Sequence, residues 1–325
     1  MNRRLAIGVD VGGTNVRIVL GDETGRILTK FSEKTNKKKG PECVSNQIIK
    51  MIHSLQKENP EAKKAIGIGV GSAGPLDLKK VGLMKPTNMP YDFVPLVEPL
   101  KDAYKLPTYL LNDCAAAVLG EKYFGAGKEY SNVAYITIST GIGGGVYVDN
   151  HLLTGKDGNA HEIGHFTIDS KGRLRCGCGK RGHWEAYCAG SSIPNFVRLL
   201  IEEKKPKELI GSLLLKAVNK DLSQLTTKTL FDAAKAGDPL SIRLVEEIGI
   251  LNAIGFACVT DAYDPSIITV GGAVALNNAD MVIAPIKKYI CDHARNRLPE
   301  IFLTSLGEYV VAHGALGMVF NQDDL

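Results

Sequence analysis

Apolar runs separated by glycine-containing turns dominate the start of the chain and predict a β-meander. Residues 5–11, 15–21 and 26–31 are expected to be strands, because each run is bounded by turn residues. Gly12 and Gly13 occupy the first connection. Strands joined by such short turns pair antiparallel, so an antiparallel sheet is expected here.

An amphipathic helix is expected after the meander. Val44, Ile48, Ile52 and Leu55 recur near the helical period, and Pro41 stands where a first helical turn would begin.

Two further strands and a second helix are predicted next. The strands cover residues 65–70 and 108–111, and an alanine-rich helix runs from about 115 to 124. Asn112 and Asp113 therefore lie at a junction between a strand and a helix.

The strand, glycine turn and strand pattern then occurs a second time. Residues 133–139 are an expected strand, 141–145 a glycine turn and 146–149 a returning strand. This repetition predicts two similar halves. Later elements are expected to be helices over 230–236, 240–260 and 281–290 and a strand over 267–270.

Length, charge and cysteine content narrow the class of protein. A chain of 325 residues exceeds the size at which one core usually stops growing, so two lobes with a cleft are expected. The net charge of +4 is small and the lysines are scattered, which argues against a nucleic-acid partner. No run reaches the roughly eighteen apolar residues of a membrane span, and the seven cysteines have no framework spacing. We expect a cytoplasmic protein without a membrane partner.

Three glycine turns are candidate phosphate cradles, because residues without Cβ atoms let backbone amides approach an anion. A plain hairpin turn is the alternative for the first one, and an ordinary turn without a ligand is the alternative for the third. The chain contains neither a G-x-x-x-x-G-K-[ST] run nor the H-R-D and D-F-G motifs of protein kinases. The candidate residues are Asp10, Gly12, Gly13, Thr14 and Asn15; Thr140, Gly141 and Gly143; and Gly271, Gly272 and Ala273.

Several motifs together resemble the ROK family of bacteria and archaea, which is part of the actin-like sugar-kinase superfamily. The resemblance covers nearly the whole chain: 10–17 (DVGGTNVR), 69–77 (GVGSAGPLD), 87–90 (TNMP), 111–115 (LNDCA), 140–165 and 176–185. It implies a two-lobed α/β fold of the actin-like (ribonuclease H-like) kind with an interdomain cleft. The expected domains are 1–113 plus about 310–325, and 114–309.

The resemblance implies that Asp113 is the catalytic base and that the glycine turns bind Mg-ATP. A base suits this position because a sugar hydroxyl must lose its proton as it attacks phosphorus. The alternative for Asp113 is a helix N-cap, and that for Glu162 is a solvated surface carboxylate. Arg17, His161 and Trp184 are interpreted as structural. The implied sugar-binding residues are Asn88, Asn112, Asp113, Glu162, His165 and Glu185.

The segment 176–185 resembles the zinc loop of the family, with His183 where the third cysteine stands. His165, Cys176, Cys178 and His183 form a nitrogen and sulfur set suited to tetrahedral Zn²⁺. Cys188 is an alternative fourth ligand, and a loop of free thiols without metal is the alternative to the whole site. A closed four-ligand site would be structural and would fix the loop that carries Glu185.

The expected activity is an ATP-dependent hexose kinase, most specifically a glucokinase that phosphorylates the 6-hydroxyl of glucose. An N-acyl-hexosamine kinase or a fructokinase is the alternative among enzymes. A sugar-sensing transcriptional regulator is the alternative of another class, although the N-terminal helix-turn-helix extension of such regulators is missing here. Family resemblance also implies a homodimer or a higher homo-oligomer.

Overall fold

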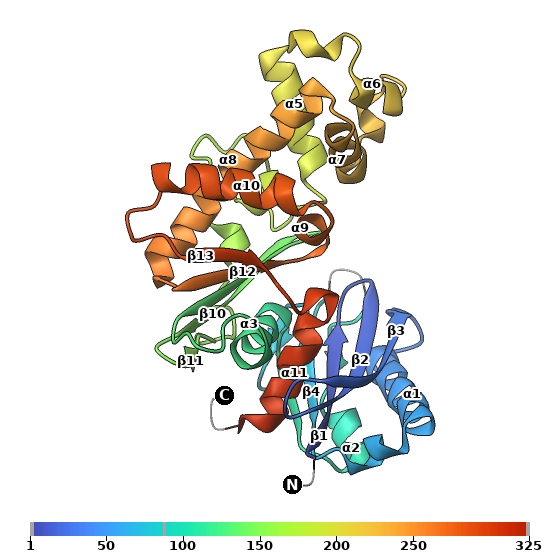
Figure 1. Ribbon diagram of the computed structural model, residues 1–325. Coiled ribbons are helices and arrows are strands. Elements are labelled where there is room, and N and C mark those ends of the chain that lie inside the picture. The colour runs from blue at the N-terminus through green and yellow to red at the C-terminus, as the bar shows by residue number, and fades with distance from the viewer. Residues whose placement is uncertain (1–2, 87–88, 323–325) are drawn as a thin grey trace. The chain divides into compact units, whose positions relative to one another are not determined.

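The computed structural model describes residues 3–86 and 89–322, and the chain divides into two units (Figure 1). One unit comprises Met1–Tyr135, Gly145–His161 and Thr304–Leu325, and the other comprises Ile136–Gly144 and Glu162–Leu303. The domain boundary expected at 113/114 stays a prediction, as does a cleft. The predicted α/β class is confirmed, because the described residues contain two five-stranded sheets with helices around them.

The first sheet has the strand order β3-β2-β1-β4-β8. The pairs β1–β2 and β2–β3 are antiparallel, which confirms the predicted meander, while β1–β4 and β4–β8 are parallel. The strand expected at 65–70 begins three residues later. The strands are β1 (Leu5–Val11), β2 (Asn15–Asp22), β3 (Ile27–Lys34), β4 (Ile68–Ser72) and β8 (Thr108–Asn112).

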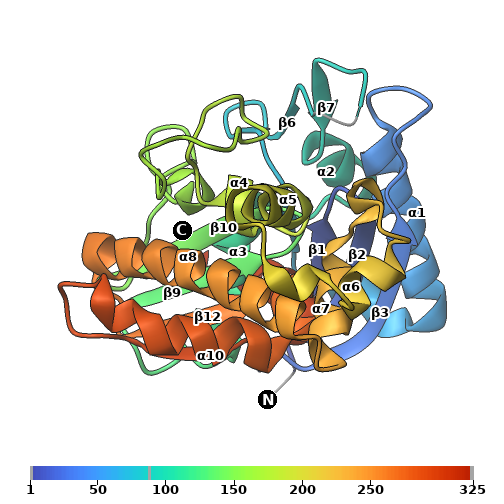
Figure 2. The same ribbon diagram turned by 90° about the horizontal axis from the view of Figure 1, so that it is seen from above.

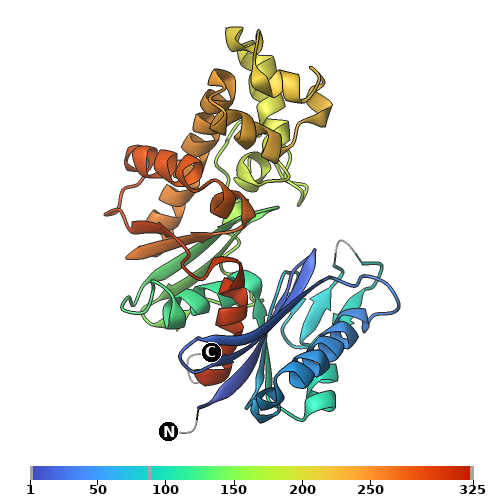
Figure 3. The same ribbon diagram turned by 45° about the vertical axis from the view of Figure 1, so that its right-hand side comes forward.

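Alternate side chains of β1 enter two separate cores on the two faces of this sheet. Val9 packs in the core that contains Ile48 of α1 (Cys43–Glu58), whereas Ala6 packs with Leu316 of α11 (Val310–Phe320). Figure 3 shows α1 and α11 on opposite sides of the strands. Gly69 allows the close approach of α11, since a Cβ atom there would lie 1.9 Å from the Ala315 carbonyl oxygen.

The second sheet repeats the strand order of the first, with β11-β10-β9-β12-β13. This agreement confirms the duplicated strand unit expected from the sequence. The predicted glycine turn over 141–145 is wrong, because Gly143, Gly144 and Gly145 lie within β10 and the turn is shorter. A Cβ atom on Gly145 would lie 2.0 Å from the Cys114 carbonyl oxygen, so this glycine allows close packing. The strands are β9 (Val133–Ile138), β10 (Ile142–Val148), β11 (His151–Leu152), β12 (Ile267–Gly271) and β13 (Glu300–Leu303).

Helices α8 (Pro239–Tyr263) and α10 (Ala279–Tyr289) lie side by side and contact each other (Figure 2). The helix expected over 240–260 is therefore present, with slightly wider bounds. Asp238 is the N-cap of α8 and Pro239 its first residue, as helix-start chemistry favours.

The remaining elements complete the two units, and among them the buried helix α3 (Asp113–Phe124) packs against α11. None of the helices in ranges 3–86 and 89–322 combines the length and apolar character required to cross a membrane. The elements are α2 (Glu98–Tyr104), α3 (Asp113–Phe124), α4 (Glu185–Cys188), α5 (Ile193–Lys204), α6 (Leu213–Ala217), α7 (Thr227–Lys235) and α9 (Ala273–Asn277), the strands β5 (Leu76–Asp77), β6 (Gly82–Met84) and β7 (Phe93–Pro95), and the 3-10 turns η1 (Pro60–Lys64), η2 (Ile163–His165), η3 (Lys207–Leu209), η4 (Leu222–Gln224), η5 (Ile290–Asp292) and η6 (Gly307–Tyr309).

Candidate active site and metal centre

Asp10 lies near the carboxyl end of β1, directly before the first glycine turn. Its carboxylate is 6% exposed and accepts a hydrogen bond from the Arg17 guanidinium at 3.1 Å. Burial raises the pKa of Asp10 to about 7, with Arg17 opposing the rise and the Asp113 carboxylate adding to it. Two acidic groups are therefore held close together within one unit.

Arg17 is the cross-strand partner of Asp10 in the β1–β2 hairpin. Its second terminal nitrogen pairs with Glu308 at 3.1 Å. The interpretation of Arg17 as a structural residue missed its contact with a candidate site carboxylate. The hairpin register could have predicted this contact, because pairing Val11 with Val16 across the turn places Asp10 opposite Arg17.

Asp113 is the first residue of α3, where β8 runs into the helix. The N-cap is Asn112, whose side chain accepts from the backbone N–H groups of Cys114 at 2.9 Å and Ala115 at 3.4 Å. Asp113 itself accepts from the Cys114 N–H at 2.8 Å, and burial raises the pKa of its carboxyl. The N-cap alternative for Asp113 is thus wrong, since Asn112 has that role.

The second and third glycine turns lie next to each other in the other unit. Gly272 follows β12 with a φ of 88°, and a Cβ atom there would lie 2.5 Å from the Ile138 carbonyl oxygen at the end of β9. The turn that holds Thr140 and Gly141 begins directly after Ile138. The structure thus brings together two segments that are 130 residues apart in the sequence.

The segment after α4 supports the second glycine turn. Ser191 donates from its backbone N–H and from its hydroxyl to the Thr140 carbonyl oxygen, at 3.1 and 2.7 Å, and the Gly190 N–H donates to the Ser139 carbonyl oxygen at 2.7 Å. Sequence reasoning did not identify Ser191. Nothing in the residues near it signals this contact, because it joins positions about fifty residues apart.

Glu185 connects the second glycine turn to the cysteine-rich loop. One carboxylate oxygen accepts from the Ile142 N–H at 3.0 Å, and the other lies 3.5 Å from the Cys176 sulfur. A Cβ atom on Gly141 would lie 2.6 Å from the same carboxylate, so the Glu185 side chain would have to shift for a larger residue at this position.

His165, Cys176, Cys178 and His183 form a compact cluster whose ligand atoms all lie within 4.8 Å of one another. The Cys176 sulfur lies 3.7 Å from His165 Nδ1, and the Cys178 sulfur lies 3.3 Å from His183 Nδ1. Bond lengths to zinc of about 2.0–2.3 Å place tetrahedral ligands roughly 3.5 Å apart, which matches these spacings. The chemistry and spacing of this donor set therefore fit a zinc ion.

Burial shifts the pKa values of two cluster residues. Burial, helped by the neighbouring Cys178 and Glu185, raises the pKa of Cys176 to about 12. Burial lowers the pKa of His183, with the neighbouring His165 as a further cause. A neutral imidazole is ready to ligate, whereas the Cys176 thiolate needs a positive partner.

Cys188 lies outside this cluster, although it was the alternative fourth ligand. Its sulfur is fully buried and donates to the Ile248 carbonyl oxygen at 3.6 Å. Glu162 is exposed and its carboxylate lies 3.6 Å from His165 Nε2, on the ring nitrogen opposite to Cys176. Asn88, the remaining predicted sugar-binding residue, lies outside the described residues.

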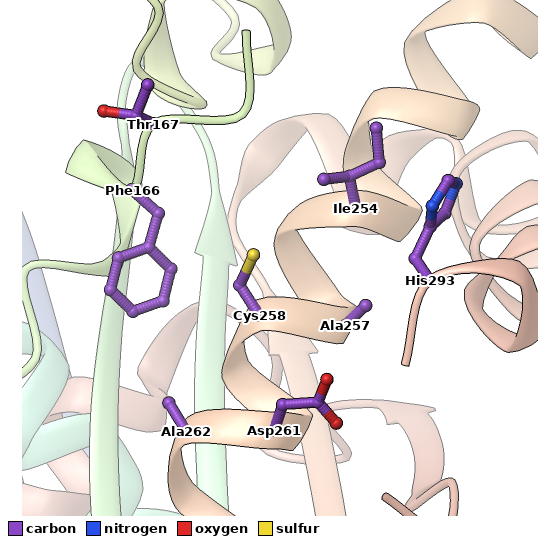
Figure 4. A pocket seen from close by; sticks show the side chains of 8 residues that line it. All are labelled: Phe166, Thr167, Ile254, Ala257, Cys258, Asp261, Ala262 and His293. Atoms are coloured by element: carbon purple, nitrogen blue, oxygen red, sulfur yellow. The ribbon is translucent and has the colours of Figure 1, made fainter. Parts of the chain in front are cut away.

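A separate pocket of about 650 Å³ lies beside α8 (Figure 4). It contains none of the predicted sugar, ATP or metal residues, although Phe166 and Thr167 in its lining follow His165. The Asp261 carboxylate at this pocket accepts from the backbone N–H groups of Arg295 and Asn296 at 2.9–3.0 Å. Its role is thus to hold the segment after η5.

The predicted site residues fall into two groups within separate units. Asp10, the first glycine turn, Asn112 and Asp113 belong to the first unit, and the second and third turns with the metal cluster belong to the other. That these groups build one active site stays a prediction.

Comparison with known proteins identifies the family. Residues 6–322 match the ROK family. The chain belongs to this family. A glucokinase of Pyrobaculum calidifontis is 36% identical over 314 residues, covering 97% of this chain and 94% of that enzyme. The confirmed membership explains the order of the motifs at 10–17, 111–115 and 140–165.

Both a ROK kinase and a sugar-responsive repressor resemble this chain. The crystal structure of a ROK family glucokinase from Streptomyces griseus in complex with glucose and AMPPNP matches with a TM-score of 0.75 at 30% identity, over 96% of this chain and 97% of that one. A xylose repressor of Bacillus subtilis is 27% identical, over 97% of this ROK protein and 77% of the repressor. The oligomeric state and cytoplasmic location of this ROK protein stay predictions.

Proposed function

We infer that this protein is an ATP-dependent hexose kinase that phosphorylates the 6-hydroxyl of glucose, with Asp113 as the general base. The observation that carries this proposal is the placement of Asp113. It is the first residue of α3 but not its N-cap, and its carboxylate lies near a second one, that of Asp10. Glucokinase relatives that align over nearly the full chain support the same reaction.

The chemistry assigned to Asp113 is a single proton transfer. As the sugar oxygen bonds to the γ-phosphorus and the bond to the β,γ-bridging oxygen breaks, the hydroxyl proton moves to the Asp113 carboxylate. ADP leaves with the electrons of the broken bond. The raised pKa of Asp113 suits this role, because a more basic carboxylate is a better proton acceptor.

Phosphate groups are assigned to the glycine turns. Gly13 is not in the left-handed region of φ, and apart from its two neighbours in the chain no atom of the described residues lies within 4 Å of the place where its Cβ would stand. Neither strain nor protein packing therefore explains a glycine there, whereas close approach by a phosphate does. In the other unit, Thr140, Gly141 and Gly143 would contact phosphates, and Gly271, Gly272 and Ala273 would border the adenosine.

Two metal ions have different assigned roles. Mg²⁺ bound with ATP supplies charge neutralisation of the phosphate oxygens. Zinc would be held by His165, Cys176, Cys178 and His183 with no open position, so its contribution is to fix the loop. Glu185 and Glu162, which adjoin this cluster, would accept hydrogen bonds from sugar hydroxyls together with Asn112. His165 would donate one from Nε2, because its Nδ1 faces the metal cluster.

A coupled assay of ADP release tests the proposal. The purified protein is given ATP, Mg²⁺ and in turn glucose, mannose, fructose, N-acetylglucosamine and N-acetylmannosamine, with a reaction lacking sugar as the control for ATP hydrolysis. We expect the largest kcat/KM with glucose. A clear preference for an acetylated sugar or for fructose would replace the substrate assignment and leave the kinase chemistry standing.

The similarity to a xylose repressor supports a second candidate, a protein that binds sugar without phosphorylating it. Trp184 is the single tryptophan of the chain and stands between His183 and Glu185 in the sequence, so its fluorescence serves as a probe of the proposed sugar pocket. A fluorescence response to a sugar that gives no ADP release would favour the sensor over the kinase.

A further inference from the structure

The segment 166–184, which carries three of the four cluster residues, is folded on itself. Thr167 bridges to His183, and Arg175 bridges to Arg181, each in antiparallel fashion. The Cys176 N–H donates to the Lys180 carbonyl oxygen at 2.8 Å. These backbone contacts shape the tip of the loop, but they do not attach it to the rest of the unit.

Asp169 sits at the base of this loop and is 9% exposed. Its carboxylate accepts from the backbone N–H groups of Lys171 at 3.0 Å and Arg173 at 3.2 Å, and from Arg173 Nε at 2.9 Å. Burial raises the pKa of Asp169, but hydrogen bonds from the Tyr187 hydroxyl, Arg173 and the backbone outweigh it and lower the pKa to about 2, so the group is ionised at neutral pH. One charged side chain thereby organises the segment that leads to Cys176.

Tyr187 attaches this network to α4. Its hydroxyl donates to the Asp169 carboxylate at 2.6 Å and accepts from the Leu174 N–H at 3.0 Å. The ring is fully buried and meets Phe196 edge-on, with centroids 5.3 Å apart. Since Phe196 belongs to α5, the hydroxyl is held by the helical core of the unit.

We propose that Asp169 and Tyr187 are positioning residues that hold the cysteine-rich loop in its metal-binding arrangement before the ion arrives. The inference rests on the zinc site proposed above. Neither residue belongs to the four-residue cluster. Both act through residues 171–174 of the loop, which they hold by hydrogen bonds and which lead to Cys176. The ligand spacings of 3.3 and 3.7 Å occur with this network intact.

Preorganisation predicts a loss of metal affinity when the network is cut. Without Asp169, the loop must be ordered at the moment of binding, and that ordering opposes binding. Residues that support metal ligands from outside commonly change affinity by about 10–100-fold when altered. We expect about a tenfold weaker zinc affinity and faster zinc release for Asp169→Asn, which keeps the shape and removes the charge.

The experiment compares five full-length proteins: wild type, Asp169→Asn, Tyr187→Phe, the double variant of these two, and Asp221→Asn. Asp221→Asn is the matched control, because it removes the same charge from an exposed turn of the same unit. Zinc affinity is measured by competition with a chromogenic chelator, and the Trp184 fluorescence is followed in parallel. Tyr187→Phe should act in the same direction as Asp169→Asn, and the double variant should lose little more than either single one.

A merely structural role gives a different result. Thermal unfolding of the metal-free variants would then shift while the zinc affinity and release rate stayed at the wild-type values, and that outcome overturns the inference. Should Asp169→Asn fail to fold, Tyr187→Phe decides alone, because it removes one hydroxyl from a retained ring. If the wild type itself binds no zinc, the proposed metal site is wrong and this inference fails with it.

Discussion

Asp10 and Asp113 illustrate how one environment changes two carboxyl groups in the same direction. Burial is the largest cause of the raised pKa of each, and the Asp113 charge adds to the shift at Asp10. Arg17 works against the shift at Asp10 from 3.1 Å. The pKa of Asp10 is raised to about 7 and that of Asp113 is raised as well. A more basic carboxylate is a better proton acceptor, so this environment favours proton transfer.

Replacing Asp113 by Asn tests the base at this scale. We expect kcat to fall by about 10²–10⁴-fold, because the amide cannot take the hydroxyl proton, while glucose binding stays near that of the wild type. Stopped-time ADP assays give kcat, and Trp184 fluorescence gives the sugar affinity. Asn112→Ala is the comparison variant: it removes the cap of α3 and should lower thermal stability along with activity. Near-normal turnover by Asp113→Asn would remove Asp113 from the mechanism.

At the scale of the element, α8 depends on a single buried cap. The Asp238 carboxylate is 2% exposed and accepts from the Ser241 N–H and hydroxyl at 3.0 and 2.6 Å. It also accepts from the Leu213 N–H at 2.8 Å and the Ser212 hydroxyl at 3.0 Å, which ties the start of α6 to the same point. These bonds lower the pKa of Asp238.

Asp238→Ala should destabilise this unit by about 2–4 kcal/mol, because a cap is lost and buried donors are left without an acceptor. Hydrogen exchange at the first turn of α8 is the measurement, and protection should fall there first. The native pKa is below the unfolded one, so this stabilisation is present above the ordinary carboxyl pKa and is lost as the pH falls through the native value. Wild type and variant should therefore converge in acid, and equal protection at neutral pH would contradict the assignment.

At the scale of the whole molecule, chain order separates residues that act together. Ser139–Gly141 and Gly271–Ala273 meet in one unit because β9 and β12 are neighbours in the second sheet. The same unit holds a metal cluster whose loop touches the second glycine turn through Glu185. A metal at this cluster would thus stabilise more of the unit than its own loop.

Metal removal tests this consequence. Protein purified without chelators should contain about one zinc per chain, and a strong chelator should lower the midpoint of thermal unfolding by more than about 5 °C. His183→Ala should lose the zinc, whereas Cys188→Ala should keep it, because Cys188 is buried against Ile248 away from the cluster. Elemental analysis of the three proteins gives the answer. Zinc loss in Cys188→Ala alone would mean that the fourth ligand had been assigned to the wrong residue.

The candidate site could be predicted in part. Asp10, Asp113 and the four cluster residues lie in short sequence motifs that resemble those of the family. These motifs were sufficient to indicate them as candidates. The interactions that support them could not be predicted. Ser191 reaches Thr140, and Tyr187 reaches Asp169, only because separate elements meet.

The sequence by itself determined the α/β class, the meander and the repeated strand unit, since hydrophobic period and glycine turns are local properties. Its short motifs, among them 10–17 and 111–115, indicated the family. Tertiary structure decided that Asn112 rather than Asp113 caps α3, that His183 rather than Cys188 joins the cluster, and that the glycines at 143–145 belong to a strand. Each of these depends on which atoms approach from elsewhere in the chain. Packing decides which side chain accepts from the first amides of α3, which carbonyl oxygen the Cys188 sulfur meets, and where Gly145 must allow close contact. No local sequence pattern encodes these contacts.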